Sequence, residues 1–155
     1  MNSIASQIQD ILLQCHQTLS TAESCTSGRI AAQLTTVPGA SGYFQGGLVA
    51  YQDHLKVDLL GVMAQDIIEH DVVSQPVVEQ MVRGACHLFH TDYAIATTGY
   101  AGEGNGRVPA GHIWIGWGSA EDVHSLLLEA KGNRESNTCQ AVDVALASFL
   151  KYLQV

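Results

Sequence analysis

Positive charge is scarce in this chain, and that scarcity excludes one class of partner. Lysine and arginine together number 7 against 15 aspartates and glutamates, which gives a net charge of −8 at pH 7. Nucleic-acid binding depends on clustered cations that neutralise phosphates, so we expect no nucleic-acid partner. A small phosphorylated ligand remains compatible with this composition, because it needs only one or two cations and some backbone amides.

The sequence also lacks long apolar runs and paired cysteines. No stretch reaches the roughly 18 apolar residues of a membrane span, and the opening Met-Asn-Ser-Ile-Ala-Ser does not resemble a secretory signal. The four cysteines, at positions 15, 25, 86 and 139, form no C-x-x-C pair and have no histidine in metal-ligand spacing. We therefore expect reduced thiols, no metal, no membrane contact and a cytoplasmic location.

Apolar periodicity predicts helices that alternate with short strands. The expected helices cover residues 3–17, 28–36, 54–60, 63–70, 74–89 and 135–153, and the expected strands cover residues 19–22, 47–51, 92–98, 112–117 and 123–130. The last two strands form an antiparallel hairpin. This order predicts one α/β domain over residues 1–155, a three-layer α/β/α sandwich with a mixed, mostly parallel sheet.

The stretch of residues 39–56 combines a serine, a tyrosine and a lysine with four glycines. Lys56 is one of only three lysines in the chain, and Ser41 lies in a turn flanked by glycines. A hydroxyl nucleophile beside a lysine is one way to build an acyl-transfer site, with Tyr51 at the end of the expected strand. The alternative is that Ser41 caps a helix and Lys56 is solvated.

A second polar cluster, Glu-Ser-Cys-Thr-Ser-Gly at residues 23–28, follows the first expected strand and opens a helix. Ser24, Thr26 and Gly28 offer hydroxyls and free amides at a helix start, a setting that binds anions. Simple helix capping also explains these residues. Glu23, at the strand end, would be partly buried and would need partners.

A third loop, residues 98–106, follows a buried strand and holds four glycines. Such a loop allows close approach of the backbone to a ligand; the alternative is that it is simply flexible. Arg134 opens the last helix, where a cation opposes the helix dipole, so it is a candidate for binding an anion. We expect the loops at 23–28, 39–56 and 98–106 to converge on one active site at an edge of the sheet.

Several motifs in order resemble the CinA C-terminal-domain family over about residues 5–153. They are A-E-S-C-T-S-G at 22–28, P-G-A-S at 38–41, G-L-V-A-Y at 47–51, T-G-Y-A-G at 98–102 and G-H-I-W at 111–114. The resemblance implies the same three-layer sandwich. The best-known members are amidases that convert nicotinamide mononucleotide to nicotinic acid mononucleotide and ammonia. It therefore implies a small nucleotide substrate, no cofactor and a homo-oligomer, a dimer or larger.

The resemblance also implies roles for individual residues. Ser41 matches the nucleophile, Lys56 its base and Tyr51 the hydroxyl that assists the pair. The remaining matches are substrate contacts, made by side chains or by backbone amides of the glycine-rich turns: Ser24, Thr26, Gly28, Gly47, Thr98, Gly99 and Arg134. A lysine acts as a base only when it is neutral, so this assignment requires a depressed pKa for Lys56.

Departures from the family pattern keep a second interpretation open. Ser27 stands where many relatives have glycine, Glu103 stands where many have proline, and the loop before Gly111 is short. A carboxylate that points into the site would repel a substrate phosphate. The alternative function is therefore a catalytically silent or altered-specificity protein that binds a nucleotide-like ligand.

Overall fold

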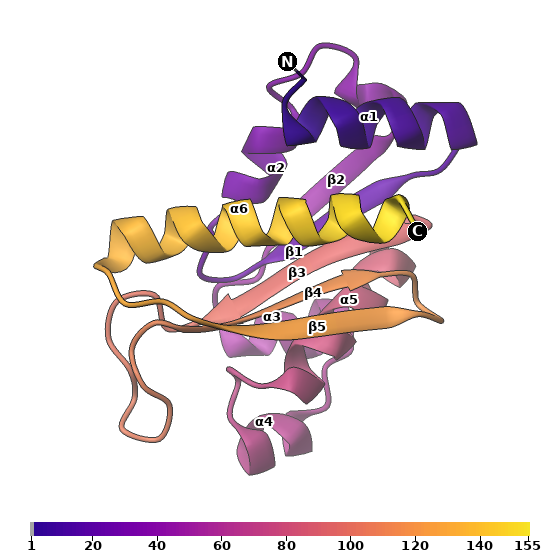
Figure 1. The fold of residues 1–155 in the computed structure, drawn as a ribbon. Helices are drawn as coiled ribbons and strands as arrows, with labels where there is room; N and C mark the ends of the chain where they lie inside the picture. Colours follow the sequence, from indigo (N-terminus) through magenta and orange to yellow (C-terminus); the bar gives the residue numbers. More distant parts are fainter. Residues whose placement is uncertain (1) are drawn as a thin grey trace.

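The computed structural model, which describes residues 2–155, places five strands in one sheet between two layers of helices (Figure 1). The strand order is β2-β1-β3-β4-β5. The strands are β1 (Leu19–Glu23), β2 (Phe44–Val49), β3 (Tyr93–Gly99), β4 (His112–Gly118) and β5 (Val123–Glu129). The three-layer α/β/α sandwich expected from the sequence is confirmed.

The sheet is mixed, with parallel and antiparallel pairs in equal number. β1 pairs in parallel with β2 and β3, whereas β4 pairs antiparallel with β3 and β5. The prediction of a mostly parallel sheet is thus slightly off. Parallel neighbours need a crossover, usually a helix, and the loop of residues 100–111 between β3 and β4 contains none.

The helices divide between the two faces of the sheet, and each face has its own apolar core. One face carries α1 (Ile4–Cys15), α2 (Arg29–Leu34) and α6 (Arg134–Leu153). The other carries α3 (Asp53–Leu60), α4 (Ala64–His70) and α5 (Gln75–Phe89). Ile8, Ile30, Ile95 and Phe149 meet in the first core, and Ala22, Val78, Met81 and Ala96 meet in the second. The longer helices α1, α5 and α6 therefore each bury one apolar stripe, whereas no residue of α4 is fully buried.

The packing of α3 on α5 depends on a glycine. A Cβ atom added at Gly84 in α5 would lie 2.0 Å from the carbonyl oxygen of Leu60, the last residue of α3. Only glycine allows the two backbones to approach so closely. Because α3 carries Lys56, this contact helps to set the position of the lysine.

One boundary differs from the sequence prediction in a way that matters for the site. The strand expected at residues 47–51 runs over β2, Phe44–Val49, so that residues 39–43 precede it. Ala40–Gly42 form a short 3-10 helix, η1, at that end. The ordered strand is longer at its beginning because Gly46 and Gly47 pair with Ser20 and Thr21 of β1.

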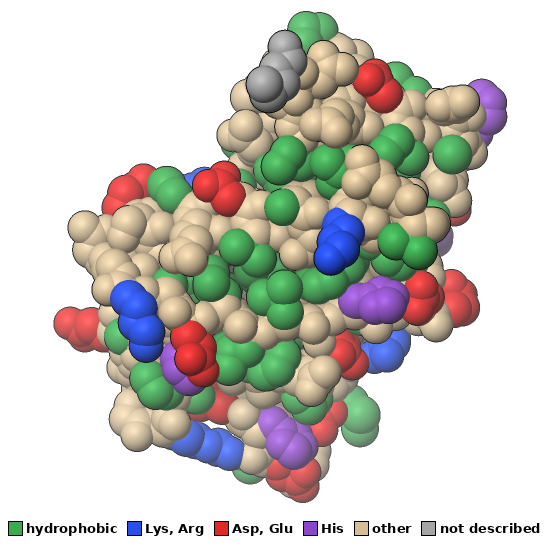
Figure 2. All heavy atoms as spheres, in the orientation of Figure 1, with side chains coloured by type: hydrophobic (Ala, Val, Ile, Leu, Met, Phe, Trp, Pro, Cys, Tyr) green, Lys and Arg blue, Asp and Glu red, His purple; other side chains and the backbone are tan. Residues whose placement is uncertain are grey.

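The surface of residues 2–155 reflects the low content of lysine and arginine in the sequence. On the face seen in Figure 2 the Lys and Arg side chains are scattered singly, whereas hydrophobic side chains gather along α6 and β5. None of the described helices is long and apolar enough to cross a membrane. All four cysteines are free thiols.

Candidate active site

A cavity of about 350 Å³ lies at the carboxyl ends of the parallel strands. Ser24 and Cys25 follow β1, Tyr51 and Lys56 follow β2, and residues 98–103 end β3 and begin the next loop. Arg134 from the first turn of α6 completes the wall. Ligands in α/β folds bind at this edge of the sheet, so the cavity is the candidate active site.

At the start of α2, a carboxylate of the protein itself accepts hydrogen bonds from the backbone amides. Glu23, which is 1% exposed, accepts hydrogen bonds from the amides of Ile30 (2.9 Å) and Ala31 (3.1 Å). The Thr26 hydroxyl donates to the same carboxylate at 2.7 Å. These three bonds compensate the desolvation of the buried charge. They also occupy amides that a substrate anion would otherwise use.

Ser24 lies where β1 ends and the turn to α2 begins. Its amide continues the parallel ladder by donating to the Thr97 carbonyl at 3.1 Å. Its carbonyl accepts the amide of Ser27, also at 3.1 Å. These backbone bonds fix the residue while its side chain lines the cavity. A hydroxyl held on rigid backbone and open to a cavity is suited to nucleophilic attack.

Lys56 is buried, with 1% of its surface exposed, although it carries an amine. The Nζ atom donates to the carbonyl of Ala50 at 2.7 Å and lies 3.9 Å from a carboxylate oxygen of Asp53. Burial lowers the pKa of Lys56 from its ordinary 10.5, and the charge of Asp53 opposes that shift. The shift is in the direction that a general base requires.

Tyr51 and Cys25 bring two more titratable groups to the cavity. Tyr51 is 57% exposed and lines the mouth of the cavity together with Lys56. Burial raises the pKa of the Cys25 thiol to about 11. The thiol is therefore protonated at neutral pH, so attack by either Cys25 or the neighbouring Ser24 needs a base that removes the proton.

The third wall combines β3, its loop and the start of α6. The Thr98 hydroxyl donates to the carbonyl of Val72 at 3.0 Å and ties the wall to the segment before α5. The guanidinium of Arg134 lies against Gly102, where an added Cβ would come within 2.4 Å of Nη2. Asn137 of α6 donates to the Ala101 carbonyl at 2.9 Å. The amides of residues 101–103 donate to no acceptor within the described chain, so they are available to a ligand.

The structure does not bring Ser41 to Lys56, and the dyad predicted from the sequence is not formed. Ser41 is exposed in η1, before β2, and the neighbouring Tyr43 carbonyl accepts the amide of Leu19 at the start of β1. Lys56 follows the other end of β2. The six residues of that strand separate the two by about 20 Å at ~3.3 Å per residue.

Three further predicted contacts also lie outside the cavity lining. Thr26 is fully buried and bonded to Glu23 and Thr97, as structural capping requires. Gly28 adopts a φ of +89° before α2, and Gly47 packs its backbone against Thr21 within the sheet. Tyr51, Lys56, Ser24, Thr98, Gly99 and Arg134 do line it.

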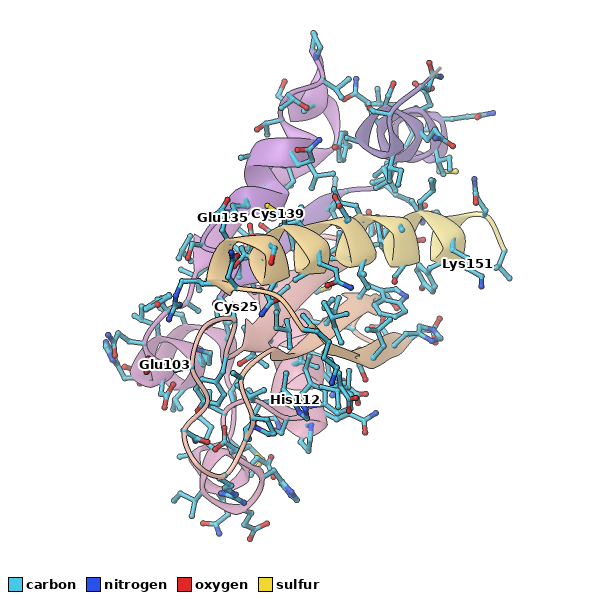
Figure 3. The ribbon with its side chains drawn as sticks, turned by 60° about the vertical axis from the view of Figure 1, so that its left-hand side comes forward. Cys25, Glu103, His112, Glu135, Cys139 and Lys151 are labelled. Carbon is cyan, nitrogen blue, oxygen red and sulfur yellow. The ribbon has the colours of Figure 1, made fainter. Side chains whose placement is uncertain are left out.

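Sequence reasoning missed some residues of the cavity. Asp53, which begins α3, lines the cavity beside Lys56. Val72 and Val73 form one wall. Tyr100 could have been found from the sequence, because it lies within the glycine-rich loop of residues 98–106. Figure 3 shows Glu103 on that loop and Cys25 near the first turns of α6. Ser27 does not line the cavity, whereas Glu103 does.

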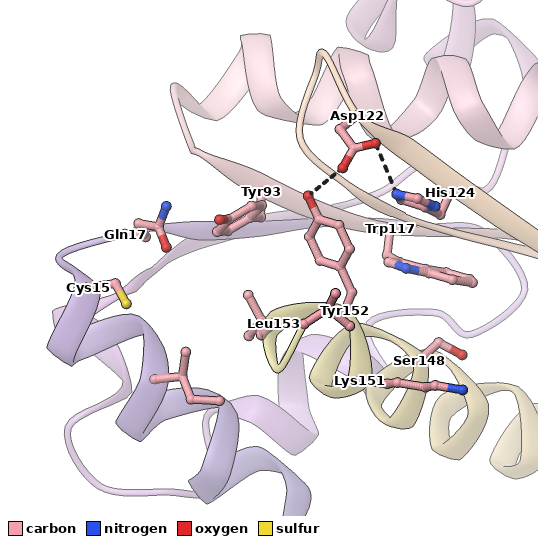
Figure 4. A pocket seen from close by; sticks show the side chains of 12 residues that line it. Cys15, Gln17, Tyr93, Trp117, Asp122, His124, Ser148, Lys151, Tyr152 and Leu153 are labelled. Atoms are coloured by element: carbon pink, nitrogen blue, oxygen red, sulfur yellow. Dashed lines mark hydrogen bonds and ion pairs between the residues drawn. The ribbon is translucent and has the colours of Figure 1, made fainter.

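A larger cavity, of about 640 Å³, lies at the opposite edge of the sheet (Figure 4). It is lined mainly by α1, α6 and aromatic side chains, and the Tyr152 hydroxyl donates to Asp122 at 3.2 Å. His124 lies 3.0 Å from the same carboxylate and stacks on Trp117. Asp122, His124 and Tyr152 are engaged with one another, and Lys151, the amine of this lining, is exposed, whereas Lys56 in the smaller cavity is buried. We therefore assign the chemistry to the smaller cavity.

Comparison with known proteins places this arrangement in context. The family model described as the CinA C-terminal domain matches residues 1–153. A CinA-like protein of Synechococcus is 42% identical over 148 residues, which cover 94% of this chain and 35% of that protein. The nicotinamide-nucleotide amidohydrolase PncC of Shewanella oneidensis is 37% identical over 147 residues, which cover 94% of this chain and 34% of that protein.

Solved structures give the same result for the fold. The competence damage-inducible protein A of Klebsiella pneumoniae superposes with a TM-score of 0.93 at 31% identity, covering 97% of this chain and 95% of that one. The chain thus matches that structure over nearly its full length, but it spans only about a third of the length of the curated relatives named above.

Proposed function

The chain belongs to the family of CinA C-terminal domains, and we propose that it is an amidohydrolase that converts nicotinamide mononucleotide to nicotinic acid mononucleotide and ammonia. The observation that carries the proposal is the meeting of Ser24, Tyr51 and the buried Lys56 in one cavity at the carboxyl edge of the sheet. A relative of 37% identity that is named as a nicotinamide-nucleotide amidohydrolase supports the choice of substrate.

In the proposed reaction Ser24 is the nucleophile and Lys56 the base. The neutral amine of Lys56 takes the proton of the Ser24 hydroxyl, and Oγ bonds to the carboxamide carbon. The carbon–nitrogen bond then breaks, and the leaving nitrogen takes that proton back to depart as ammonia. Water attacks the resulting ester with the same amine as base, and the acid and free Ser24 are released. Tyr51 also lines the cavity, and we assign its hydroxyl the transfer of a proton between Ser24 and Lys56.

The charged intermediate and the substrate phosphate also find partners in this cavity. The unpaired amides of residues 101–103 provide donors for an oxyanion. Arg134, exposed at the start of α6, supplies a cation for the phosphate, which accounts for anion binding by a protein of net charge −8. We propose a small nucleotide as the partner of this site; nucleic acid is disfavoured because Lys56 and Arg134 are the basic residues of its lining and the proposed reaction needs Lys56 to be neutral.

The test is ammonia release from nicotinamide mononucleotide by the purified chain, with nicotinic acid mononucleotide identified as the second product. Turnover at an ordinary enzyme rate, roughly 1 s⁻¹ or faster, supports the proposal. The carboxylate of Glu103 in the cavity favours the alternative of a silent, ligand-binding protein. Thermal stabilisation by the nucleotide without any ammonia would establish that alternative and reject the amidase.

A further inference from the structure

Asp71, between α4 and α5, has a backbone conformation that is almost restricted to glycine. Its φ is +75° and its ψ is 156°. A residue with a side chain stays in this region only when its surroundings hold it there, and such strain gathers at functional sites. Asp71 is 6% exposed, so its carboxylate must also be compensated inside the protein. The position therefore needs a reason to carry an aspartate.

The reason lies in the partners of the Asp71 carboxylate. Oδ1 accepts the amide of Val73 at 3.0 Å and the phenol of Tyr100 at 3.2 Å. Oδ2 accepts the side-chain amide of Asn105 at 2.7 Å. Val73 and Tyr100 both line the candidate active site. One carboxylate thus joins two segments of the cavity wall that lie 27 residues or more apart in the sequence.

Asn105 continues this connection into the loop of residues 100–111. Its Oδ1 accepts the amides of Arg107 at 3.0 Å and Val108 at 2.7 Å, which fixes the turn of the loop. Its Nδ2 therefore points toward Asp71, and it also donates to the Tyr100 hydroxyl at 3.0 Å. Arg107 adds a second attachment by donating to the carbonyls of Ile68 and Glu69 at the end of α4.

The Tyr100 phenol is a stable donor in this cluster. Burial and the neighbouring charge of Asp71 raise the pKa of Tyr100 to about 12. The phenol therefore keeps its proton across the neutral range and can donate to Asp71 throughout. The three side chains form a closed network in which every member has a partner.

We propose that Asp71 is a positioning residue that holds the loop of residues 100–105 in place as a wall of the active-site cavity, through Tyr100 and Asn105. The predicted effect on substrate binding rests on the proposed amidase function, whereas the predicted effect on the loop does not. The residues that the loop brings to the cavity are Tyr100, Ala101, Gly102 and Glu103. Asp71 does not line the cavity and acts on the substrate only through them. Loosening the loop should therefore weaken substrate binding more than it slows the chemical step.

Glycine at position 71 separates the backbone from the side chain. D71G suits the observed φ and ψ and removes all bonds of the carboxylate. We expect hydrogen exchange at the hydrogen-bonded amides of Asn105, Arg107 and Val108 to rise about tenfold or more, the factor for loss of hydrogen bonds to a charged group. The KM for nicotinamide mononucleotide should rise by a similar factor, while kcat changes less than about threefold.

Two reciprocal substitutions test the pairing itself. D71N sets its new amide against a donor, either that of Asn105 or that of Val73, and N105D sets two carboxylates face to face. Each should loosen the loop as D71G does. The double variant D71N/N105D exchanges amide and carboxylate and keeps an acceptor for Arg107 and Val108, so loop exchange and KM should return toward the wild-type values.

A matched control is H90G, because His90 also has a positive φ, of 54°, but lies at the end of α5 away from the cavity. H90G should leave exchange in residues 100–108 unchanged. The proposal is overturned if D71G leaves that exchange at the wild-type level, or if the double variant is no better than the single ones. The exchange experiment uses no substrate. If the wild type releases no ammonia, the proposed function fails, while loop exchange still decides the role of Asp71.

Discussion

The carboxyl ends and the amino ends of the parallel strands each have a serine in a turn, and they differ in the residues that surround that serine. Ser24 and Ser41 are both serines in tight turns beside glycine-containing stretches. Ser24 follows β1 and shares its edge with Lys56, Thr98 and Arg134. Ser41 precedes β2 and therefore lies at the opposite end of that strand from Lys56. Strand polarity, more than the local motif, therefore decides which serine can react.

The largest expected effect on activity comes from replacing each of the two serines separately. S24A should lower kcat for nicotinamide mononucleotide by about 10³-fold or more, because it deletes the proposed nucleophile. S41A should leave kcat and KM within about twofold. Ammonia release measures both, with circular dichroism to show that each variant folds. Loss of activity in S41A alone would reverse the assignment of the two edges.

Substitution of Lys56 and the pH dependence of kcat/KM test the same assignment. K56M should lower kcat by roughly 10²- to 10⁴-fold, the usual contribution of a general base, whereas K151M at the opposite edge should not. In the wild type, kcat/KM should rise with pH until Lys56 is neutral, below its ordinary pKa of 10.5. A flat profile from pH 6 to 10 would show that Lys56 is not the base.

The same pKa shift predicts a change in stability. Below the folded-state pKa of Lys56 both the folded and the unfolded chain are protonated, and the full cost of burying the charge is present. As pH rises from that value to 10.5, the unfolded chain binds the extra proton, so the free energy of unfolding increases. The stability difference between K56M and the wild type should therefore shift in favour of the wild type as pH rises, which urea titrations at several pH values can test.

Two carboxylates at helix starts allow a comparison of stability. Glu23 is buried and accepts three hydrogen bonds, whereas Glu135 is exposed and pairs with Arg29 at 2.9 Å. E23Q should lower the free energy of unfolding by about 2 kcal/mol, because it turns a donor toward the amides of α2. E135Q should change it little, as exposed pairs do. Urea denaturation of both variants checks this, and equal effects would contradict it.

The smallest expected effect concerns the two arginines that lie near the ends of α2 and α6. R134A should raise KM about tenfold through loss of a charge-assisted contact with the phosphate, while kcat stays nearly constant. R29A removes an arginine whose guanidinium is already engaged by Glu135, so KM should not change. Initial-rate kinetics distinguish the two, and an equal rise in KM would remove Arg134 from the site.

Most of the fold followed from sequence patterns, because apolar periodicity and capping act locally. Ser3 and Asn133 cap α1 and α6 with their side chains, and the helices expected at 3–17 and 74–89 are observed as α1 and α5. The start of β2 did not follow, because Gly46 and Gly47 have low strand propensity and are ordered only by pairing with β1. The assignment of Ser41 as nucleophile rested on the family resemblance and on its nearness in sequence to Lys56, although Ser41 precedes the strand in both the expected and the observed structure.

The site was predictable only in part, for a related reason. Lys56, Tyr51, Thr98 and Arg134 were recognised because charge and polarity are rare in their surroundings. Asp71 gave no signal in the sequence, since nothing local shows a backbone conformation or a bond to Asn105 across 34 residues. The occupation of the α2 amides by Glu23 was likewise visible only in three dimensions.

The central place of β1 has a consequence for the order in which the molecule assembles. β1 pairs with β3, and Leu19 lies opposite Tyr93, so closing the centre of the sheet joins segments 74 residues apart. Contacts of such long range are slow to form, because the chain loses much entropy before the pairing gains energy. Ser24 and Thr98 come together only with that pairing, and Arg134 joins them later still during synthesis. The cavity of the candidate active site should therefore be among the last parts of a newly made chain to appear, and any assay of the proposed activity during refolding would report the final step of folding.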